Sequence, residues 1–393
     1  MAEHQAVAEH QVVVVGAGPA GLSVALSLRD RGLRPLLIDR ADGVGSSWRG
    51  RYDKLRLNTG KQLSHLPNRP YPKHTPVFPT RDQVVEHLDR HAREDGIELR
   101  LNTEVKRIDP RPGGWCLRTS GDDIDSRQVV VATGYEHTPR IPNWPGRETF
   151  TGEMLHSAAY RNPAPYLDKC VLVVGAGSSA MEIVHDVATG GAAKAWLAVR
   201  TPPNIMLRAL PFGFPSDFIA APLYSAPTWF SDTMAELGRR ISIGDLTEFG
   251  LPKPPEGVFS RGIRLGRAPA IVDKAVLTAI RDRLIEVVPT IDHFEGNMTC
   301  LIDGRRIGPD VVICATGYSH GLESLVGHLG VLDERGVPRA AGEVPAAEGL
   351  RFVGFMSRPG LIAFVARQSR VVAAHIVEEL LSSPHRDSAK HTS

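Results

Sequence analysis

The chain contains 393 residues, of which 42% are hydrophobic and 23% are charged, and its formal net charge is +2. These values describe an ordinary globular protein of two or three domains, and so small a net charge gives no argument for binding nucleic acid or a membrane surface. The four cysteines are far apart and form no C-x-x-C pair, which disfavours a disulfide framework, a metal site and a redox-active dithiol.

The two ends of the chain carry no targeting signal that we recognise. Residues 1–10 are polar, and no apolar stretch is long enough to span a bilayer, so we expect neither a signal peptide nor a membrane helix. Together with the unpaired cysteines, this predicts a cytoplasmic protein. Residues 361–381 form an amphipathic pattern that predicts a core-facing helix, and we expect residues 382–393 to be a disordered tail.

A glycine-rich turn follows the first predicted strand. Four valines at 12–15 predict a strand buried on both faces, and a helix is expected from Leu22 to about Asp30. The G-x-G-x-x-G turn between them is typical of a dinucleotide site, because its glycines permit a tight turn and close approach of a pyrophosphate to the helix N-terminus. The alternative is a glycine turn without a ligand. The expected binding residues here are Gly16, Gly18, Pro19, Ala20 and Gly21.

Three later segments extend this first site. A second strand at 35–38 ends at Asp39 and Arg40, where an acidic side chain suits the ribose of an adenine dinucleotide. A further glycine-rich turn ends in Ser47 and Trp48. The strand at 129–132 ends in Thr133 and Gly134.

Between these segments, prolines exclude regular structure at 67–79. A helix is expected at 83–95 behind a cap at Thr80, and strands are expected near 97–108 and 115–119.

The chain then repeats this pattern. Residues 171–181 copy the opening strand and turn, with alanine in the third glycine position, and residues 311–318 copy the A-T-G-Y strand end at 132–135. The strand at 195–199 takes the place of 35–38. Two Rossmann-like units are therefore predicted. The expected binding residues of the second unit are Gly175, Gly177, Ser178, Ser179, Ala180, Arg200, Thr201, Thr316 and Gly317.

The two copies differ at the end of their second strand. The first has Asp39, which suits a ribose 2′-hydroxyl, and the second has Arg200, which suits a 2′-phosphate. The first unit should therefore hold FAD, and the second should hold NADPH in preference to NADH, helped by Thr201. An ordinary surface arginine is the alternative for Arg200.

Residues 150–160 lie between the two fingerprints and read F-T-G-E-M-L-H-S-A-A-Y. This segment resembles the F-x-G-x-x-x-H-x-x-x-Y motif of the class B flavin-containing monooxygenases and matches every fixed position. Tyrosine at 160 favours the N- and S-oxygenating branch or its YUCCA-type relatives over the Baeyer–Villiger enzymes. The segments at 52–55 and 249–254 are also YUCCA-like, and the resemblance covers about residues 11–381.

The resemblance implies an α/β fold of two Rossmann-like dinucleotide-binding domains, of the three-layer ββα/βαβ type, with the NADPH domain inserted into the FAD domain. We expect the FAD domain at 10–155 plus 312–381 and the NADPH domain at 156–311. The proline- and aromatic-rich insertion at 202–270 would form a substrate lid, a helical layer or a dimer contact.

The resemblance also suggests roles for three residues. Asn58 lies in an N-T-G-K run similar to a family segment near the flavin C4a atom, and we take it as the catalytic residue; a turn-forming asparagine is the alternative. His156 is expected to be structural and to support NADPH binding. Gln368 is expected to begin the exposed part of the last helix, in a position where the family places the helix N-terminus near the flavin, although an ordinary surface glutamine fits almost as well.

The implied reaction uses NADPH and O2 to form a flavin C4a-(hydro)peroxide, which transfers one oxygen atom to a small organic substrate, at N or S first. The alternatives are Baeyer–Villiger oxidation of a ketone, YUCCA-like oxidative decarboxylation of a 2-oxo acid, a flavin disulfide reductase and a nucleotide-binding redox sensor. No metal is expected. A second copy of the chain is a candidate partner, while nucleic acid and membrane are not expected.

Overall fold

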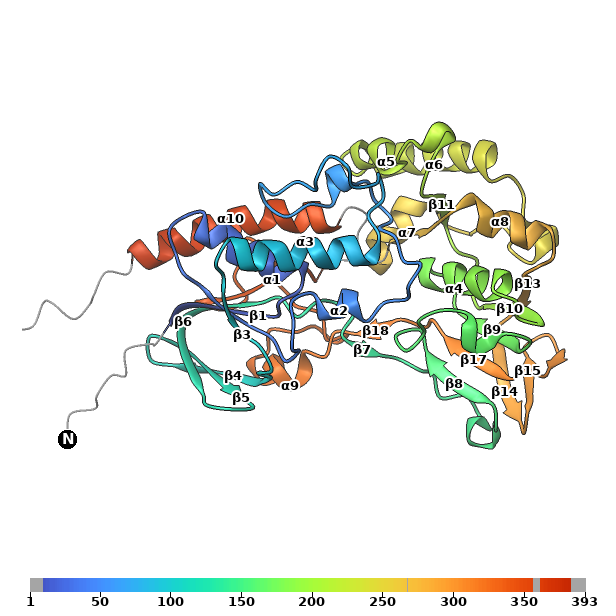
Figure 1. Ribbon diagram of the computed structural model, residues 1–393, viewed down its shortest axis with the longest axis horizontal. Coiled ribbons are helices and arrows are strands. Elements are labelled where there is room, and N and C mark those ends of the chain that lie inside the picture. Colours follow the sequence, from blue (N-terminus) through green and yellow to red (C-terminus); the bar gives the residue numbers. More distant parts are fainter. Residues whose placement is uncertain (1–9, 267, 356–360, 383–393) are drawn as a thin grey trace, which may run out of the picture.

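The computed structural model describes residues 10–266, 268–355 and 361–382. Two mainly parallel sheets lie side by side along the long axis of the molecule, and helices cover the same side of both (Figure 1). This arrangement confirms the predicted α/β fold with two Rossmann-like units. The predicted tail falls outside the described residues, apart from Ser382, which ends the last helix.

The first sheet carries the order β3-β2-β1-β6, with β19 pairing with the other side of β6. These five strands run parallel, and the valines of β1 are buried on both faces, as the run of four predicted. An antiparallel pair, β4 and β5, continues from the start of β6. The strands are β1 (His10–Val15), β2 (Leu36–Ile38), β3 (Glu98–Arg100), β4 (Val105–Arg111), β5 (Gly114–Thr119), β6 (Ile124–Val131) and β19 (Leu350–Phe352).

Helices α1 (Pro19–Arg29), α3 (Arg81–Glu94) and α10 (Leu361–Ser382) cover one face of this sheet (Figure 1). Thr80 caps α3 through a capping box with Gln83, which confirms the cap expected there. The amphipathic helix expected at 361–381 is confirmed, because Val365, Val372 and Ile376 of α10 are buried in the same core as α1. The short helices α2 (Ser46–Arg49) and α9 (Glu323–Val326) lie in the loops around the sheet.

The second sheet has the order β13-β10-β9-β17-β8 and is parallel throughout. Helices α4 (Ser178–Thr189) and α8 (Lys274–Arg281) lie on one side of it (Figure 1), and a small antiparallel meander contributes Ile291, Phe294 and Leu301 to the core on the other side. The strands are β8 (Glu153–His156), β9 (Cys170–Val174), β10 (Lys194–Val199), β13 (Glu286–Pro289) and β17 (Val311–Cys314), and the meander is β14 (Ile291–Glu295), β15 (Met298–Leu301) and β16 (Arg306–Ile307).

The domain boundaries differ from the expected ones at both points where the chain passes from one domain to the other. Strands β8 and β17 both lie in the second sheet, whereas the expected boundaries put 153–155 and 312–314 in the first domain. The reason is that β17 is a central parallel strand, which needs a partner on each side. The chain therefore crosses before β8 and after β17, where β7 (Thr138–Pro139) pairs with β18 (Tyr318–Ser319).

The insertion is mainly helical and lies above the second sheet (Figure 1). It contains a parallel pair of short strands, β11 (Ile205–Leu207) and β12 (Ala270–Val272), and the helices α5 (Asp217–Leu223), α6 (Thr228–Ser242) and α7 (Val258–Leu265). Within the described ranges, no helix combines the length and apolarity needed to cross a membrane.

Candidate nucleotide-binding and active site

The first glycine turn is shaped as a cradle at the end of β1. Gly16 has φ +107°, and a Cβ at Gly21 would lie 1.7 Å from the carbonyl oxygen of Gly16, so neither position accepts a side chain. A Cβ at Gly18, in contrast, would meet no described atom within 4 Å. Pro19 and Ala20 open α1 and are half-buried. The space left beside Gly18 fits the diphosphate of a dinucleotide at a helix N-terminus.

Asp39 lies directly beside this cradle. Its carboxylate accepts backbone N–H groups of Ala17 (2.6 Å) and Ala41 (2.9 Å), which holds it next to the turn. A carboxylate has about four acceptor positions, so two remain for a ribose. Arg40 is exposed. The pKa of His137 is lowered mainly by burial and further by the charge of Arg40.

The other residues expected at the first site lie on the loops around it. Ser47 is exposed in α2, and Trp48 packs against the core of the first domain. Gly134 follows β6 with φ +84°, and a Cβ there would meet open space in the described chain. Gln368 lies within α10, half-buried, and its side chain lies against Gly342.

The second glycine turn repeats the shape of the first cradle. Gly175 has φ +141°, and a Cβ at Gly177 would meet no described atom within 4 Å. The third position carries a buried alanine, Ala180, and a Cβ at Gly175 would lie 2.4 Å from the carbonyl oxygen of Ala315. The hydroxyl of Ser178 accepts the N–H of Ile271 (2.9 Å), which ties the helix start to β12. Ser179 is half-buried.

Arg200 and Thr201 follow β10 and are both exposed. Arg200 makes no hydrogen bond or ion pair with the described part of the chain, so its guanidinium is available to a ligand beside the second cradle. Thr316 and Gly317 follow β17, where the Thr316 hydroxyl donates to the carbonyl of Arg140. Gly317 has φ +85°, like Gly134 at the first site.

Every fixed position of the 150–160 motif has a structural contact. Phe150 packs on Phe294, with ring centres 5.2 Å apart, and a Cβ at Gly152 would lie 2.5 Å from the Phe150 ring. His156 accepts the N–H of Ala158 at Nδ1 (3.1 Å) and donates from Nε2 to the Gly317 carbonyl (3.0 Å). Tyr160 is fully buried and donates to Asp186 (2.7 Å).

These contacts agree with the structural role expected for His156. Both ring nitrogens are occupied by backbone groups, which fixes the neutral tautomer with its proton on Nε2. Burial lowers the pKa of His156 below its usual value, so the neutral form is further favoured. The imidazole has no free nitrogen with which to act as a base, and it joins β8 to the loop that follows β17.

The two domains meet where the segment after α2 lies on α4. Tyr52 is buried in the core of the second domain, and its hydroxyl donates to Glu182 of α4. Lys54 forms an ion pair with Asp186 one turn further along α4 (2.7 Å). Asn58 accepts a hydrogen bond at Oδ1 from Nη2 of Arg208 (3.2 Å), which comes from the insertion. The expected catalytic residue therefore lies at the seam between the domains.

Glu182 and Arg208 are part of this seam and were not expected there from the sequence. A signal for Glu182 was present, because Glu182 and Asp186 are two acids four residues apart in a helix that also carries Met181, Ile183, Val184 and Val187. Such a pair on one helix face is unusual unless it meets polar partners. Arg208 carries no comparable signal, since its partners come from three distant segments of the chain.

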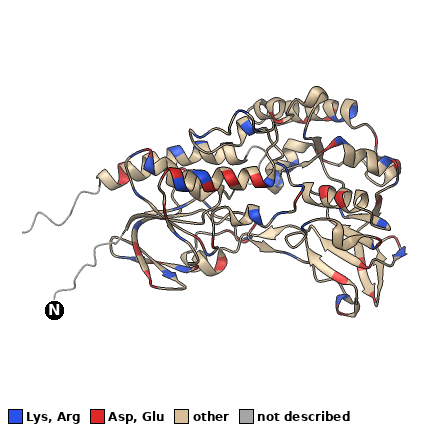
Figure 2. Ribbon diagram, viewed as in Figure 1, with Lys and Arg blue, Asp and Glu red and all other residues tan. Residues whose placement is uncertain are grey.

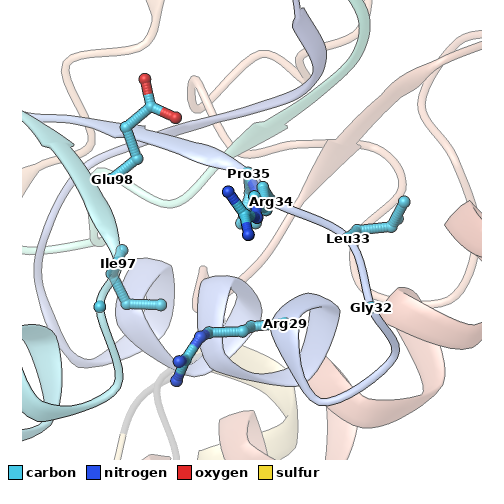
Figure 3. A pocket seen from close by; sticks show the side chains of 8 residues that line it. Arg29, Gly32, Leu33, Arg34, Pro35, Ile97 and Glu98 are labelled. Atoms are coloured by element: carbon cyan, nitrogen blue, oxygen red, sulfur yellow. The ribbon is translucent and has the colours of Figure 1, made fainter.

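One surface hollow has a volume of about 490 Å³ (Figure 3). It is formed at the end of α1 and the start of β2 and β3, opposite to the end where the glycine turn lies. Its lining residues are Arg29, Gly32, Leu33, Arg34, Pro35, Gly96, Ile97 and Glu98. In parallel α/β sheets, ligands bind at the carboxyl ends of the strands, so this hollow is not the nucleotide site.

Comparisons with known proteins agree with this geometry. A family model described as pyridine nucleotide-disulphide oxidoreductase matches residues 13–203. Indole-3-pyruvate monooxygenase YUCCA4 of Oryza sativa subsp. japonica is 33% identical over 94% of this chain and 87% of the relative. Probable indole-3-pyruvate monooxygenase YUCCA9 of Arabidopsis thaliana is 31% identical over 84% of this chain and 79% of the relative.

Solved structures share the fold. The flavin-containing monooxygenase from Stenotrophomonas maltophilia has a TM-score of 0.71 at 23% identity and covers 94% of this chain and 98% of its own. OTEMO in complex with FAD and NADP has a TM-score of 0.70 at 16% identity, with coverages of 95% and 85%. Two dinucleotide folds joined in this order define a two-nucleotide flavoprotein oxidoreductase. The chain belongs to the class B flavin-containing monooxygenases, in the group formed by the YUCCA-type enzymes.

Proposed function

We propose that this chain is an FAD-dependent, NADPH-consuming monooxygenase that transfers one oxygen atom of O2 to a nitrogen or sulfur atom of a small organic substrate. The observation that carries the proposal is the contact of Asn58 with Arg208 at the seam between two nucleotide cradles. Asn58 belongs to the first domain and Arg208 to the second, so this contact lies where the two nucleotide domains meet. The flavin, once reduced by NADPH, supplies the chemistry that activates O2.

Each of the two cradles binds a different cofactor. Gly16, Gly18, Gly21 and Asp39 hold FAD, and Gly175, Gly177 and Ala180 hold NADPH. Arg200 and Thr201 bind the 2′-phosphate, which supports a preference for NADPH over NADH. The free guanidinium of Arg200 suits a bidentate contact with phosphate oxygens.

Asn58 then acts as a hydrogen-bond donor at the reaction site. Arg208 is a donor only, so the oxygen of the Asn58 amide faces it and the NH2 group is left over. An amide NH2 stabilises a reacting oxygen atom without transferring a proton to it. The titratable side chains around it, Tyr52, Glu182 and Arg208, are bound to one another, so the protein contributes position and exclusion of water rather than acid–base catalysis.

A second candidate function is oxidative decarboxylation of a 2-oxo acid. The YUCCA-type relatives, which are named as indole-3-pyruvate monooxygenases, favour it. A carboxylate substrate needs an uncommitted cation, however, and Arg208, the cation that contacts Asn58, is committed to other groups. Arg208 is paired with Glu182 and Asp273, and Lys61 donates to the carbonyls of Lys73 and Thr75. This favours a substrate that is oxygenated at a nitrogen or sulfur atom over a 2-oxo acid.

Product analysis against a mixed panel tests both candidates. The purified protein, loaded with FAD, is given NADPH and air with a sulfide, a tertiary amine, a ketone and a 2-oxo acid. Oxygenated sulfide or amine is the expected product. Decarboxylated acid or ester alone would move the assignment to the YUCCA-like or Baeyer–Villiger reaction. Consumption of NADPH without any oxygenated product would contradict a monooxygenase and favour an oxidase or a redox sensor.

We also propose that the enzyme works in the cytoplasm as a homodimer. Its four cysteines are free thiols in the described structure, which suits a reducing compartment. Charges of both signs are interspersed over both domains (Figure 2), so neither nucleic acid nor an anionic membrane is an expected partner. The outer face of α6 exposes large apolar side chains, which supports burial against a second copy.

A further inference from the structure

A continuous chain of polar side chains crosses the seam between the two domains. Tyr52 of the first domain donates to Glu182 of the second, and Nη2 of Arg208 donates to the same carboxylate. Nη2 of Arg208 also donates to Oδ1 of Asn58 (3.2 Å), and Nη1 donates to Asp273 (2.9 Å). One guanidinium therefore joins three segments of the second domain to the expected catalytic residue of the first.

This network is costly to bury, so packing alone does not explain it. Tyr52 is 4% exposed and Arg208 is 3% exposed, and Nε of Arg208 is buried without a partner among the described residues. Burial raises the pKa of Glu182 even though Arg208 opposes the shift. Buried ion pairs are weak sources of stability, and apolar residues of similar size often do as well. What such a pair provides is a defined geometry for the groups it touches.

The loop that carries Asn58 is held at several points. Leu57 donates its N–H to the carbonyl of Pro79 (2.9 Å), and the hydroxyls of Thr59 and Ser64 are 2.6 Å apart. Gly60 donates its N–H to Asp217 at the start of α5 (2.9 Å). The backbone on both sides of Asn58 is thus fixed, and the carboxamide is the part whose orientation depends on Arg208.

We propose that Arg208 is a positioning residue that fixes the Asn58 carboxamide with its oxygen toward the insertion and its NH2 group left to donate at the reaction site. This inference rests on the proposed function of Asn58. Because Arg208 is held by Glu182 of α4 and Asp273 before α8, the orientation of Asn58 depends on correct seating of the NADPH domain. This link suits a reaction in which NADPH has to be bound before oxygen is transferred, because Asn58 is then oriented only when the NADPH domain is in place.

Arginine is required here rather than a positive charge alone. Its planar fork reaches Glu182, Asp273 and Asn58 at once, whereas lysine offers one nitrogen on a flexible stem. The variant R208K therefore keeps the charge beside Glu182 but loses the fixed donor to Asn58. A purely electrostatic role would be rescued by lysine, and a positioning role would not.

The experiment compares wild type and R208K, both loaded with FAD. We measure the rate of flavin reduction by NADPH and the coupling, meaning the oxygenated product formed per NADPH consumed. Reduction should stay close to wild type, while coupling should fall about tenfold, the effect of losing one charge-assisted hydrogen bond. The matched control is K54M, which removes the Lys54–Asp186 ion pair across the same seam without touching Asn58 and should leave coupling unchanged.

A double variant shows whether the effect passes through Asn58. In an N58L background, R208K should change coupling by less than about twofold, because the group that it positions is already gone. Full coupling in R208K alone, or an undiminished effect of R208K in the N58L background, would overturn the proposal. If wild type itself gives no oxygenated product from any substrate of the panel, the proposed function has failed instead.

If the R208K variant does not bind FAD, the same measurements are made on the double variant R208M/E182Q. It removes both buried charges together, so neither is left unpaired, and the glutamine that replaces Glu182 keeps an acceptor for the Tyr52 hydroxyl. Low coupling with normal flavin reduction supports the proposal. If this neutral variant also loses FAD or unfolds, the network serves folding, and the positioning role is contradicted.

Discussion

The hydroxyl of Tyr52 donates a hydrogen bond to the carboxylate of Glu182, which places a side chain of the first nucleotide domain in the core of the second. Tyr52 follows α2, directly beyond the first cradle, and Glu182 lies in the first turn after the second fingerprint. This contact helps to connect the two nucleotide domains. Burial, reinforced by Glu182, raises the pKa of Tyr52 well above its ordinary value, so the phenol stays protonated and remains the donor.

The glycines at the centre of each cradle give the sharpest test of cofactor placement. Gly18 and Gly177 have φ of −81° and −86°, and a Cβ on either meets no described protein atom within 4 Å. Gly18→Ala should therefore fold normally but bind FAD about tenfold more weakly, because the methyl group occupies the space of the diphosphate. Gly177→Ala should instead retain FAD and raise the KM for NADPH. Fluorimetric FAD titration and steady-state kinetics measure the two effects, and equal effects of both variants on both cofactors would contradict the assignment.

Replacing Arg200 tests the nucleotide preference. Arg200→Ala should raise the KM for NADPH about tenfold to a hundredfold and leave that for NADH unchanged, since one charge-assisted contact with the 2′-phosphate is lost. Arg305→Ala, which removes another partly exposed arginine of the same domain, held by Asp303, is the control and should change neither. An equal loss with both nucleotides would refute the phosphate contact.

Asn58→Leu separates reduction of the flavin from transfer of oxygen. Flavin reduction by NADPH should proceed at the wild-type rate, because leucine has a similar size and the cradles are untouched. The yield of oxygenated product per NADPH should fall about tenfold, with hydrogen peroxide released instead, because the amide donor is absent. Stopped-flow reduction and a peroxide assay provide the measurements. Unchanged coupling would remove Asn58 from the mechanism.

The cradles were predictable from sequence, whereas the seam between them was not. Gly16, Gly18 and Gly21 lie close together in the sequence and shape one local turn, so their spacing alone indicates that turn. Tyr52 and Glu182 are 130 residues apart, and Asn58 and Arg208 are 150 apart. Nothing local specifies such pairs, because the docking of two domains brings them together. The boundary at β17 was placed wrongly for a related reason, since pairing with β8 and β9 is a property of the sheet and not of the strand's own residues.

His87 predicts how stability depends on pH. It is 3% exposed and stacks on Tyr71 with ring centres 4.1 Å apart, and burial, aided by His91 and Arg90, lowers its pKa to about 3. The unfolded chain binds this proton near pH 6.5 and the folded chain does not, so stability is lost as the pH falls from about 6.5 toward 3.

Between pH 7 and pH 5 this site should remove about 2 kcal/mol from the free energy of unfolding. His87→Phe should remove that part of the acid sensitivity, as measured by urea titration at both pH values. His74→Phe, at an exposed histidine, should leave it in place. An identical pH dependence in wild type and His87→Phe would contradict the prediction.

The exposed face of α6 predicts a dimer. Phe230, Met234, Leu237 and Ile241 follow one another at helical spacing and are 36–79% exposed, which is typical of a stripe that packs on another helix. The neighbouring Glu236 is held by Arg239, Arg240 and Lys253, so the flank of the stripe carries no unpaired acid that would oppose a second copy.

Leu237→Glu should convert the dimer to a monomer, because it places a charge in the middle of the buried stripe, where an unpaired charge is strongly disfavoured. Sedimentation velocity on the FAD-loaded protein measures the change. Leu284→Glu, at an equally exposed leucine of the same domain outside α6, should remain dimeric. A wild-type protein that sediments as a monomer at micromolar concentration, or a Leu237→Glu variant that stays dimeric, would show that this face does not join two copies. Flavin reduction should be the same in both variants, since neither position contacts a cradle.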